Sequence, residues 1–142
     1  MKRKISPRSY EKLCFASYLS LFAIVVTGGL VRLTGSGLGC SDWPQCNSEK
    51  FVDVSSMHGA IEQINRLFTG FVAAIVIAAV LGSLFLAERK RSLTRLSLGL
   101  VVGVLAQVVL GGIVVLTGLN PFANMGHFLL SMVLIANAVV LC

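Results

Sequence analysis

The sequence has very little charge for its size. Of its 142 residues only 13% are Asp, Glu, Lys or Arg, whereas 56% are hydrophobic, and the mean hydropathy is +0.86. A soluble domain carries about 25% charged residues, because its surface must be hydrated. The shortage of charge excludes a free-standing soluble enzyme, a disordered tail and a nucleic-acid binder. It indicates a membrane protein surrounded by lipid.

The chain also lacks the alternation of apolar and polar residues that is typical of membrane β-barrel strands. Instead it contains four long apolar runs, each close to the roughly 20 residues that a helix needs to cross a bilayer. We predict an all-α integral membrane protein, a bundle of four transmembrane helices within residues 13–142. The four runs are Leu13–Leu33, Leu67–Ala87, Leu96–Thr117 and Gly126–Cys142.

The net charge of +6 is concentrated in two short segments. Residues 1–12 hold five basic side chains and residues 88–95 hold four, whereas residues 34–56 hold three acidic side chains and one lysine. Basic segments of membrane proteins stay on the cytoplasmic side. We therefore expect a cytoplasmic N-terminus over residues 1–12, a cytoplasmic loop over 88–95 and an extracytoplasmic loop over 34–56.

The two ends of the chain leave alternatives open. A basic start followed by an apolar run is compatible with a cleaved signal peptide, but the run has the length of a start-anchor helix. The fourth run has 17 residues from Gly126 to Cys142 and no basic residue after it. Either the protein ends flush with the membrane or the sequence is cut from a longer chain, and we expect the second.

An eight-residue pattern, Gly-Gly-x-Val-x-Leu-Thr-Gly, occurs twice in the sequence. It spans Gly28–Gly35 and Gly111–Gly118, which are 83 residues apart and identical at six of eight positions. The repeat predicts two helical hairpins in parallel, related by an axis along the membrane normal. Close helix packing alone would also explain the glycine pairs. The repeat further predicts that His58 and His127 lie at equivalent depths on the second and fourth helices.

Histidine is scarce, since His58 and His127 are the only two in the chain. Two imidazoles facing one another across a helical bundle are a typical axial ligand set for a haem iron. A two-haem cytochrome b would need four within one bundle, so that class ranks behind the others. The competing interpretation is that each histidine is an ordinary interfacial residue with one wet edge.

The start of the second helix carries a polar stripe. His58, Glu62 and Arg66 follow one another at intervals of four, so they share one helix face with Asn65 beside them. A carboxylate one turn from a candidate iron ligand is suited to acid–base work or proton delivery. The alternative is an ordinary Glu–Arg contact in the headgroup region, worth a few tenths of a kcal/mol.

The 34–56 loop contains Cys40 and Cys46, which on the oxidising side of a membrane are expected to form a disulfide. The pair lacks the Cys-x-x-Cys spacing of redox motifs, so we favour a structural staple over an electron shuttle. Arg32 lies in the outer third of the first helix. It either snorkels to the interface or holds a propionate carboxylate.

Four segments together resemble the haem A synthase family, specifically its N-terminal four-helix half. The loop motif is specific, and the likeness covers nearly the whole chain. The segments are Thr27–Asn47, His58–Leu67, Gly111–Pro121 and His127–Ser131.

The resemblance implies a membrane oxidoreductase of haem biosynthesis that oxidises the C8 methyl of haem O, its substrate, to a formyl group. The product, haem A, serves terminal oxidase assembly. Family members have two similar four-helix halves, and the other half carries haem b. The resemblance further implies a multi-pass protein of a bacterial or archaeal cell membrane, in contact with haem O synthase or oxidase assembly factors. Carried over to this chain, His127 is an axial ligand, Glu62 the acidic group tied to catalysis, and Cys40–Cys46 the loop disulfide.

Two departures from the family stand out. Many members have Glu-x-x-His-Arg on the second helix, where this chain has Asn65 in place of the histidine. Either His58 replaces that ligand at a shallower depth, or the iron has a single protein ligand. The chain also corresponds to one half, so a complete enzyme would need a homo-oligomer, another polypeptide or a missing C-terminal half.

Two other functional classes remain in competition with the enzyme. The first is a non-catalytic haem-binding assembly protein that uses the same histidines and never converts haem O. The second is a disulfide–quinone oxidoreductase, a four-helix class whose members typically have a Cys-x-x-Cys and a second cysteine pair. This chain lacks both features.

Overall fold

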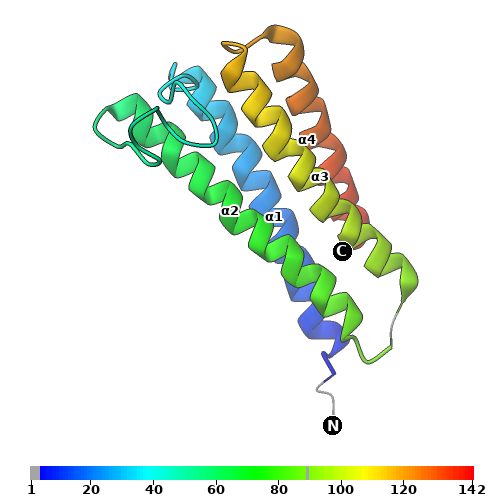
Figure 1. Ribbon diagram of the computed structural model, residues 1–142. Coiled ribbons are helices and arrows are strands. Elements are labelled where there is room, and N and C mark those ends of the chain that lie inside the picture. Colours follow the sequence, from blue (N-terminus) through cyan, green and yellow to red (C-terminus); the bar gives the residue numbers. More distant parts are fainter. Residues whose placement is uncertain (1–3, 89) are drawn as a thin grey trace.

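The computed structural model describes residues 4–88 and 90–142, which form four helices (Figure 1). They are α1 (Pro7–Leu33), α2 (Met57–Leu84), α3 (Arg91–Leu116) and α4 (Pro121–Leu141). All four are long and apolar enough to cross a membrane. Within these residues the only extended pairing is a single bridge between Ile5 and Leu86. The predicted all-helical architecture with four membrane spans is confirmed.

The second helix begins well before the apolar run that predicted it. Ser56 is its N-cap, and the Ser56 hydroxyl accepts a hydrogen bond from the Gly59 amide at 3.0 Å. Such a cap satisfies one of the amides that a helix start leaves without a partner. The polar stripe from His58 to Arg66 is therefore helical, and it forms the first two and a half turns of α2.

Helices α1 and α3 end in the same way, which explains part of the sequence repeat. Gly35 and Gly118 follow the two helices with φ of 70° and 61°, a backbone conformation that glycine adopts without strain. The amides of the next residues donate to the carbonyls of Val31 and Val114, at 2.9 and 2.8 Å. This is the hydrogen-bond pattern of the Schellman motif. The last glycine of each repeat copy is therefore a helix terminator.

The helices form a ring in which each one contacts two neighbours. The contacting pairs are α1 with α2, α2 with α3, α3 with α4, and α4 with α1, and the described residues show no close contact between diagonal helices. Figure 1 shows the 34–56 loop and the α3–α4 turn at one end of the bundle, here called the loop end. Residues 4–6 and 85–88 lie at the opposite end, where Ile5 pairs with Leu86.

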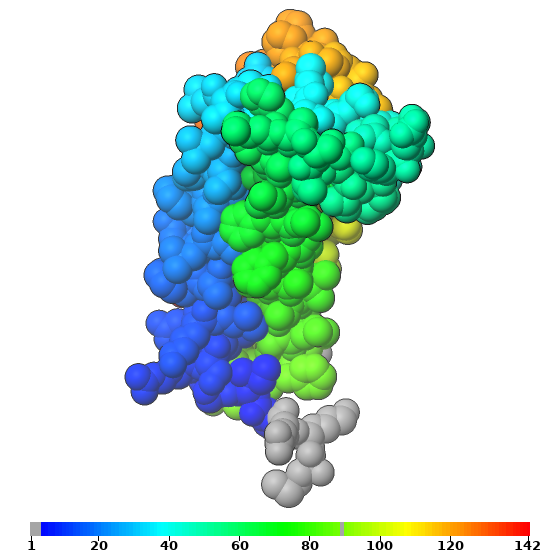
Figure 2. All heavy atoms as spheres, turned by 90° about the vertical axis from the view of Figure 1, so that its left-hand side faces the viewer, coloured from blue at the N-terminus to red at the C-terminus, as the bar shows by residue number. Residues whose placement is uncertain are grey.

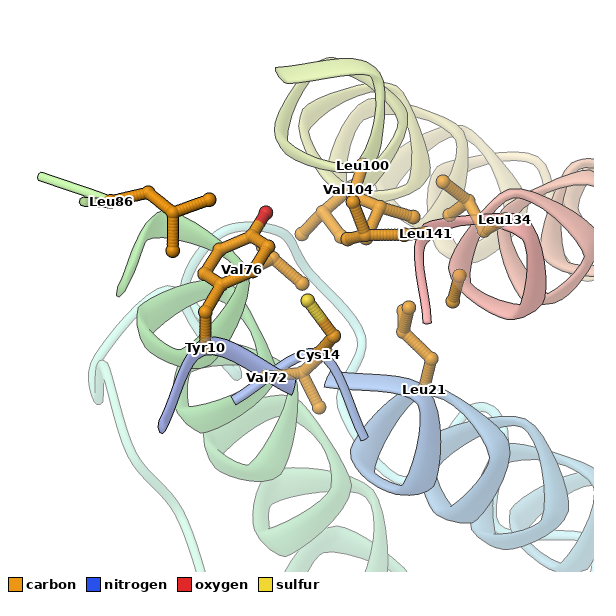
Figure 3. Close-up of a cluster of buried hydrophobic side chains, with 11 residues drawn as sticks. Tyr10, Cys14, Leu21, Val72, Val76, Leu86, Leu100, Val104, Leu134 and Leu141 are labelled. Atoms are coloured by element: carbon orange, nitrogen blue, oxygen red, sulfur yellow. The ribbon is translucent and has the colours of Figure 1, made fainter. Parts of the chain in front are cut away.

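A single apolar core fills the half of the bundle away from the loop end. All four helices contribute, with Leu100, Val72 and Val76 at most 1% exposed. Figure 3 shows these side chains pointing toward one another between the helices. In the other half of the bundle, the buried positions of α2 are Gly59, Glu62 and Gln63. Polar side chains and glycines thus occupy the interior toward the loop end.

Candidate functional site at the loop end

The 34–56 loop is closed on itself by a disulfide between Cys40 and Cys46. Both cysteines are about 1% exposed, and the Asp42 amide donates to the Cys46 carbonyl at 3.2 Å. The predicted disulfide is confirmed. Figure 2 shows the loop, coloured cyan to teal, packed across the loop end of the bundle.

Glu62 and Arg66 tie this loop to α2. Glu62 is 5% exposed, and its Oε2 accepts the Cys40 amide at 2.9 Å. Its Oε1 accepts from Arg66 Nη2 at 2.6 Å and from Arg66 Nε at 3.1 Å. Arg66 in turn donates to the carbonyls of Gln45 and Asp42, both at 3.2 Å. The pair is a buried clamp on the disulfide loop, so it is not an exposed contact among headgroups.

The loop reaches across the bundle as far as α3. A Cβ built on Gly112 would lie 2.9 Å from Cδ2 of the Trp43 indole, so the ring packs directly on the helix backbone. At the other side of the loop, Gly39 sits against the backbone of His58, where no side chain would fit. The sequence identified the glycine pairs, but it did not show that Trp43 packs on one of them.

The first glycine of each repeat copy faces a polar side chain on the neighbouring helix. The atom nearest to a Cβ on Gly28 is Nδ2 of Asn65, at 3.9 Å. The atom nearest to a Cβ on Gly111 is Cε1 of His127, at 3.6 Å. The residue that corresponds to His127 in the other hairpin is therefore Asn65. The prediction that the two histidines lie at equivalent depths is wrong.

His58 lies at the rim of the bundle. It is the second residue of α2 and is exposed, and its Nδ1 is 2.9 Å from the Ser36 hydroxyl. Seven residues separate it from Asn65, which corresponds to about 10 Å along the helix axis. No contact among the described residues joins it to His127. Its assignment as an iron ligand stays a prediction.

His127 lies on α4 next to a hydrogen-bonded group that the sequence analysis did not identify. The side-chain carboxamide of Gln107, on α3, donates through Nε2 to the His127 carbonyl at 3.0 Å and to the Ser131 hydroxyl at 2.6 Å. Ser131 also donates to the His127 carbonyl, at 2.9 Å. Gln107 is the one amide side chain in the apolar run Leu96–Thr117. A polar residue inside a membrane span often indicates a functional site, so the sequence did contain a signal for this residue.

Three buried polar atoms in this part of the bundle have no hydrogen-bond partner among the residues that the structure describes. They are Oδ1 of Asn65, Oε1 of Gln107 and Nδ1 of His127. A buried polar atom without a partner costs about 1–3 kcal/mol, so each such atom requires an explanation. A bound ligand that interacts with these atoms is one such explanation.

The remaining predicted site residue, Arg32, is exposed in the last turn of α1. The structure does not bring it to the clamp, since the ion pairs found within residues 4–88 and 90–142 are Glu62–Arg66 and Lys50–Asp53. The same residues contain no group of three or more His, Cys, Asp or Glu side chains that could hold a metal ion by themselves.

Comparison with known proteins shows what this chain resembles. A family model described as a cytochrome oxidase assembly protein matches residues 11–57. Proteins named Heme A synthase from Bacillus mycoides (strain KBAB4) and Bacillus cereus (strain AH187) are each 31% identical over 135 residues. The match covers 94% of this chain but 43% of each relative, so the chain spans about half the length of the curated relatives it matches. The chain is thus similar to haem A synthases over nearly its whole length. With its four spans, it is a multi-pass membrane protein.

Proposed function

We propose that this chain is a haem-binding half of a haem A synthase and takes part in oxidising the C8 methyl of haem O to a formyl group. The observation that carries the proposal is His127, whose Nδ1 is buried without a partner beside a glycine at the polar end of a transmembrane bundle. The relatives are named Heme A synthase, which supports a substrate in haem A synthesis.

The residues present fit a haem. A flat macrocycle between helices needs small side chains at the helix contacts, and Gly28 and Gly111 provide them. His127 would hold the iron, and the other unpartnered polar atoms, on Asn65 and Gln107, would face the group. When bound, the iron porphyrin supplies the oxidation–reduction chemistry. The resemblance to haem A synthases implies a companion half that holds haem b, so we propose haem O as the group bound by this half.

The chain's own residues contribute positioning. Converting a methyl to a formyl group removes four electrons from the carbon and adds one oxygen atom, so the substrate must be held while several steps occur. Glu62 and Arg66 fix the disulfide loop over the loop end, where it limits the entry of water. We propose that Glu62 accepts or delivers the protons of the reaction, and that Arg32, exposed at the same end, pairs with a propionate.

We further propose that the chain works in the cell membrane with its loop end outside the cytoplasm. The companion half would come from a second copy, from another polypeptide or from further sequence. Haem O synthase and oxidase assembly factors are the partners that the reaction requires, because one supplies the substrate and the others receive the product.

A non-catalytic haem-binding assembly protein is the second candidate. The family model that matches residues 11–57 is described as a cytochrome oxidase assembly protein, which supports it. A disulfide–quinone oxidoreductase has no comparable support, since Cys40–Cys46 is buried under the Glu62–Arg66 clamp.

The experiment that separates these functions identifies the pigment. The protein is produced in cells that make haem O but contain no other haem A synthase, and the haems are extracted from the purified protein. Haem A in the extract supports the synthase. Haem O alone, at a similar yield, supports the binding protein. No haem, together with cycling of Cys40–Cys46 against a quinone, would contradict both.

A further inference from the structure

Asn65 occupies the place in the α1–α2 hairpin that His127 occupies in the α3–α4 hairpin. Gly28 lies seven residues before the terminating Gly35, and Gly111 lies seven residues before Gly118. The side chain that meets the first glycine is Asn65 in one hairpin and His127 in the other. Because the two helix ends share their hydrogen bonds as well, this equivalence is set by the backbone and does not depend on sequence identity in α2 and α4.

The two equivalent residues also lie on diagonal helices. Among the described residues α2 and α4 make no close contact with each other, since each packs between α1 and α3. Asn65 and His127 each keep one buried polar atom without a hydrogen-bond partner. Each residue also meets the first glycine of its repeat copy, so an unpartnered polar atom lies at a corresponding position of each of two diagonal helices, which suits a ligand between the hairpins.

His58 does not fit this arrangement. It lies about 10 Å nearer the rim than Asn65 along the helix axis. His58 is exposed, and the hydrogen bond between its Nδ1 and the Ser36 hydroxyl holds the ring at the rim. The two helical turns between His58 and Asn65 carry Glu62, which the Arg66 ion pair and the Cys40 amide hold in place.

An asparagine carboxamide differs from an imidazole as an iron ligand. Its oxygen is a weak neutral donor, whereas the imidazole of histidine is the common protein ligand of haem iron. The carboxamide does provide both a hydrogen-bond donor and an acceptor. At this position it is therefore suited to hold a small molecule next to the iron.

From this placement we propose that His127 is the sole protein ligand to the haem iron in this chain, and that Asn65 faces an open coordination position for a small ligand. The inference rests on the proposed function, because it assumes that this half binds haem. It names Asn65 as a positioning residue and removes His58 from the ligand set.

The test is the spin state of the iron in the purified haem-loaded protein, measured by absorption and electron paramagnetic resonance. The unmodified protein is expected to be high-spin in the ferric state and to turn low-spin as imidazole is added. Asn65→His is expected to be low-spin without imidazole and to bind added imidazole about 10-fold or more weakly. His58→Ala is expected to match the unmodified protein in both measurements.

The control variants keep the outcomes distinct. Asn65→Gln retains a carboxamide and is expected to remain high-spin, which separates a loss of folding from a change of ligand. A low-spin unmodified protein that becomes high-spin in His58→Ala would overturn the inference and leave the proposed function standing. Absence of haem from every variant, including those that remain helical and monodisperse, would overturn both.

Discussion

At the residue scale, the structure decides between two interpretations of the four-residue spacing of Glu62 and Arg66. From the sequence, Glu62 and Arg66 predicted either a site or an exposed contact. The structure buries the carboxylate to 5% exposure and uses both of its oxygens, one for Arg66 and one for the Cys40 amide. The sequence could not show this, because the partners of the clamp lie more than twenty residues away in an irregular loop.

This clamp predicts a cost for removing its charge. Glu62→Gln leaves the Arg66 guanidinium half-buried without a counter-ion, and breaking such a pair costs about 3 kcal/mol. We expect a lower midpoint of thermal unfolding in detergent and faster proteolysis of the 34–56 loop. Glu11→Gln, at an exposed position of α1, is the matched control and is expected to change neither. Equal stability of the two variants would contradict the clamp.

Asn65 shows what a sequence repeat cannot reveal. The repeated pattern covers the ends of α1 and α3. It does not extend into α2 and α4, where residues of the two hairpins correspond only by their position along the helix axis. The segments that follow also differ in length, with 30 residues from Gly35 to Asn65 and nine from Gly118 to His127. The histidines were therefore paired by residue type, whereas the backbone pairs His127 with Asn65.

At the element scale, the sequence predicted the helices better than it predicted their ends. Length and apolar content were sufficient for four spans, because a helix in lipid must satisfy its backbone internally. The start of α2 was missed by ten residues, since Ser56 caps the helix well before the first long apolar stretch. Hydropathy measures the part of a helix in lipid and does not detect a polar helical extension.

The contact between the loop and α3 gives a prediction with a built-in control. Gly112→Ala places a methyl group against the indole of Trp43, whereas the repeat-equivalent Gly29→Ala meets nothing within 4 Å. We expect Gly112→Ala to displace Trp43, the only tryptophan, and to increase quenching of its fluorescence by acrylamide. Gly29→Ala is expected to leave quenching unchanged and to raise stability by up to about 1 kcal/mol. Similar quenching in both variants would contradict the packing of Trp43 on α3.

Asp53 makes the far part of the loop sensitive to acid. Hydrogen bonds from Ser55, with smaller contributions from Lys50 and Asn47, hold the pKa of the Asp53 carboxyl below its usual value of 3.8. A lowered folded-state pKa means that the carboxylate stabilises the loop above the unfolded pKa, and that this stability is lost as the pH falls through the folded pKa.

The expected result is faster amide exchange in residues 47–56 at acid pH, after correction for the intrinsic pH dependence. Asp53→Asn cannot ionise, so its exchange in this segment should already be fast at neutral pH and should change little on acidification. A segment that stays protected in Asp53→Asn would show that the carboxylate does not hold the loop.

At the scale of the whole molecule, the bundle is divided into two halves of different character. The apolar core, away from the loop end, contains residues from all four helices. The polar residues of the candidate site lie toward the loop end; they are Glu62, Asn65, Gln107 and His127. The sequence predicted the polar stripe on α2 but not the division, because hydropathy does not show which faces of the four helices meet. Among the described residues, unpartnered buried polar atoms occur in both halves, on Tyr10 and Asn137 as well, but toward the loop end three of them accompany the glycine pairs, where a ligand could complete them.

The charge distribution predicts how this bundle lies in the membrane. We expect the loop end outside the cytoplasm, since the basic segments lie at the opposite end. In a Cys142→Ser background, a cysteine placed at Ser48 should react with a membrane-impermeant thiol reagent in intact cells, and one placed at Ser92 should not. The reverse labelling pattern would contradict the orientation.

The measurement that tests the central claim most directly is the haem content of the purified protein, compared between the unmodified chain, His127→Ala and His58→Ala. We expect His127→Ala to lose the haem while it remains helical, because the imidazole whose Nδ1 is buried near the loop end is the proposed iron ligand. His58→Ala should keep the haem, since His58 lies at the rim. Equal haem content in the unmodified chain and His127→Ala would contradict the account.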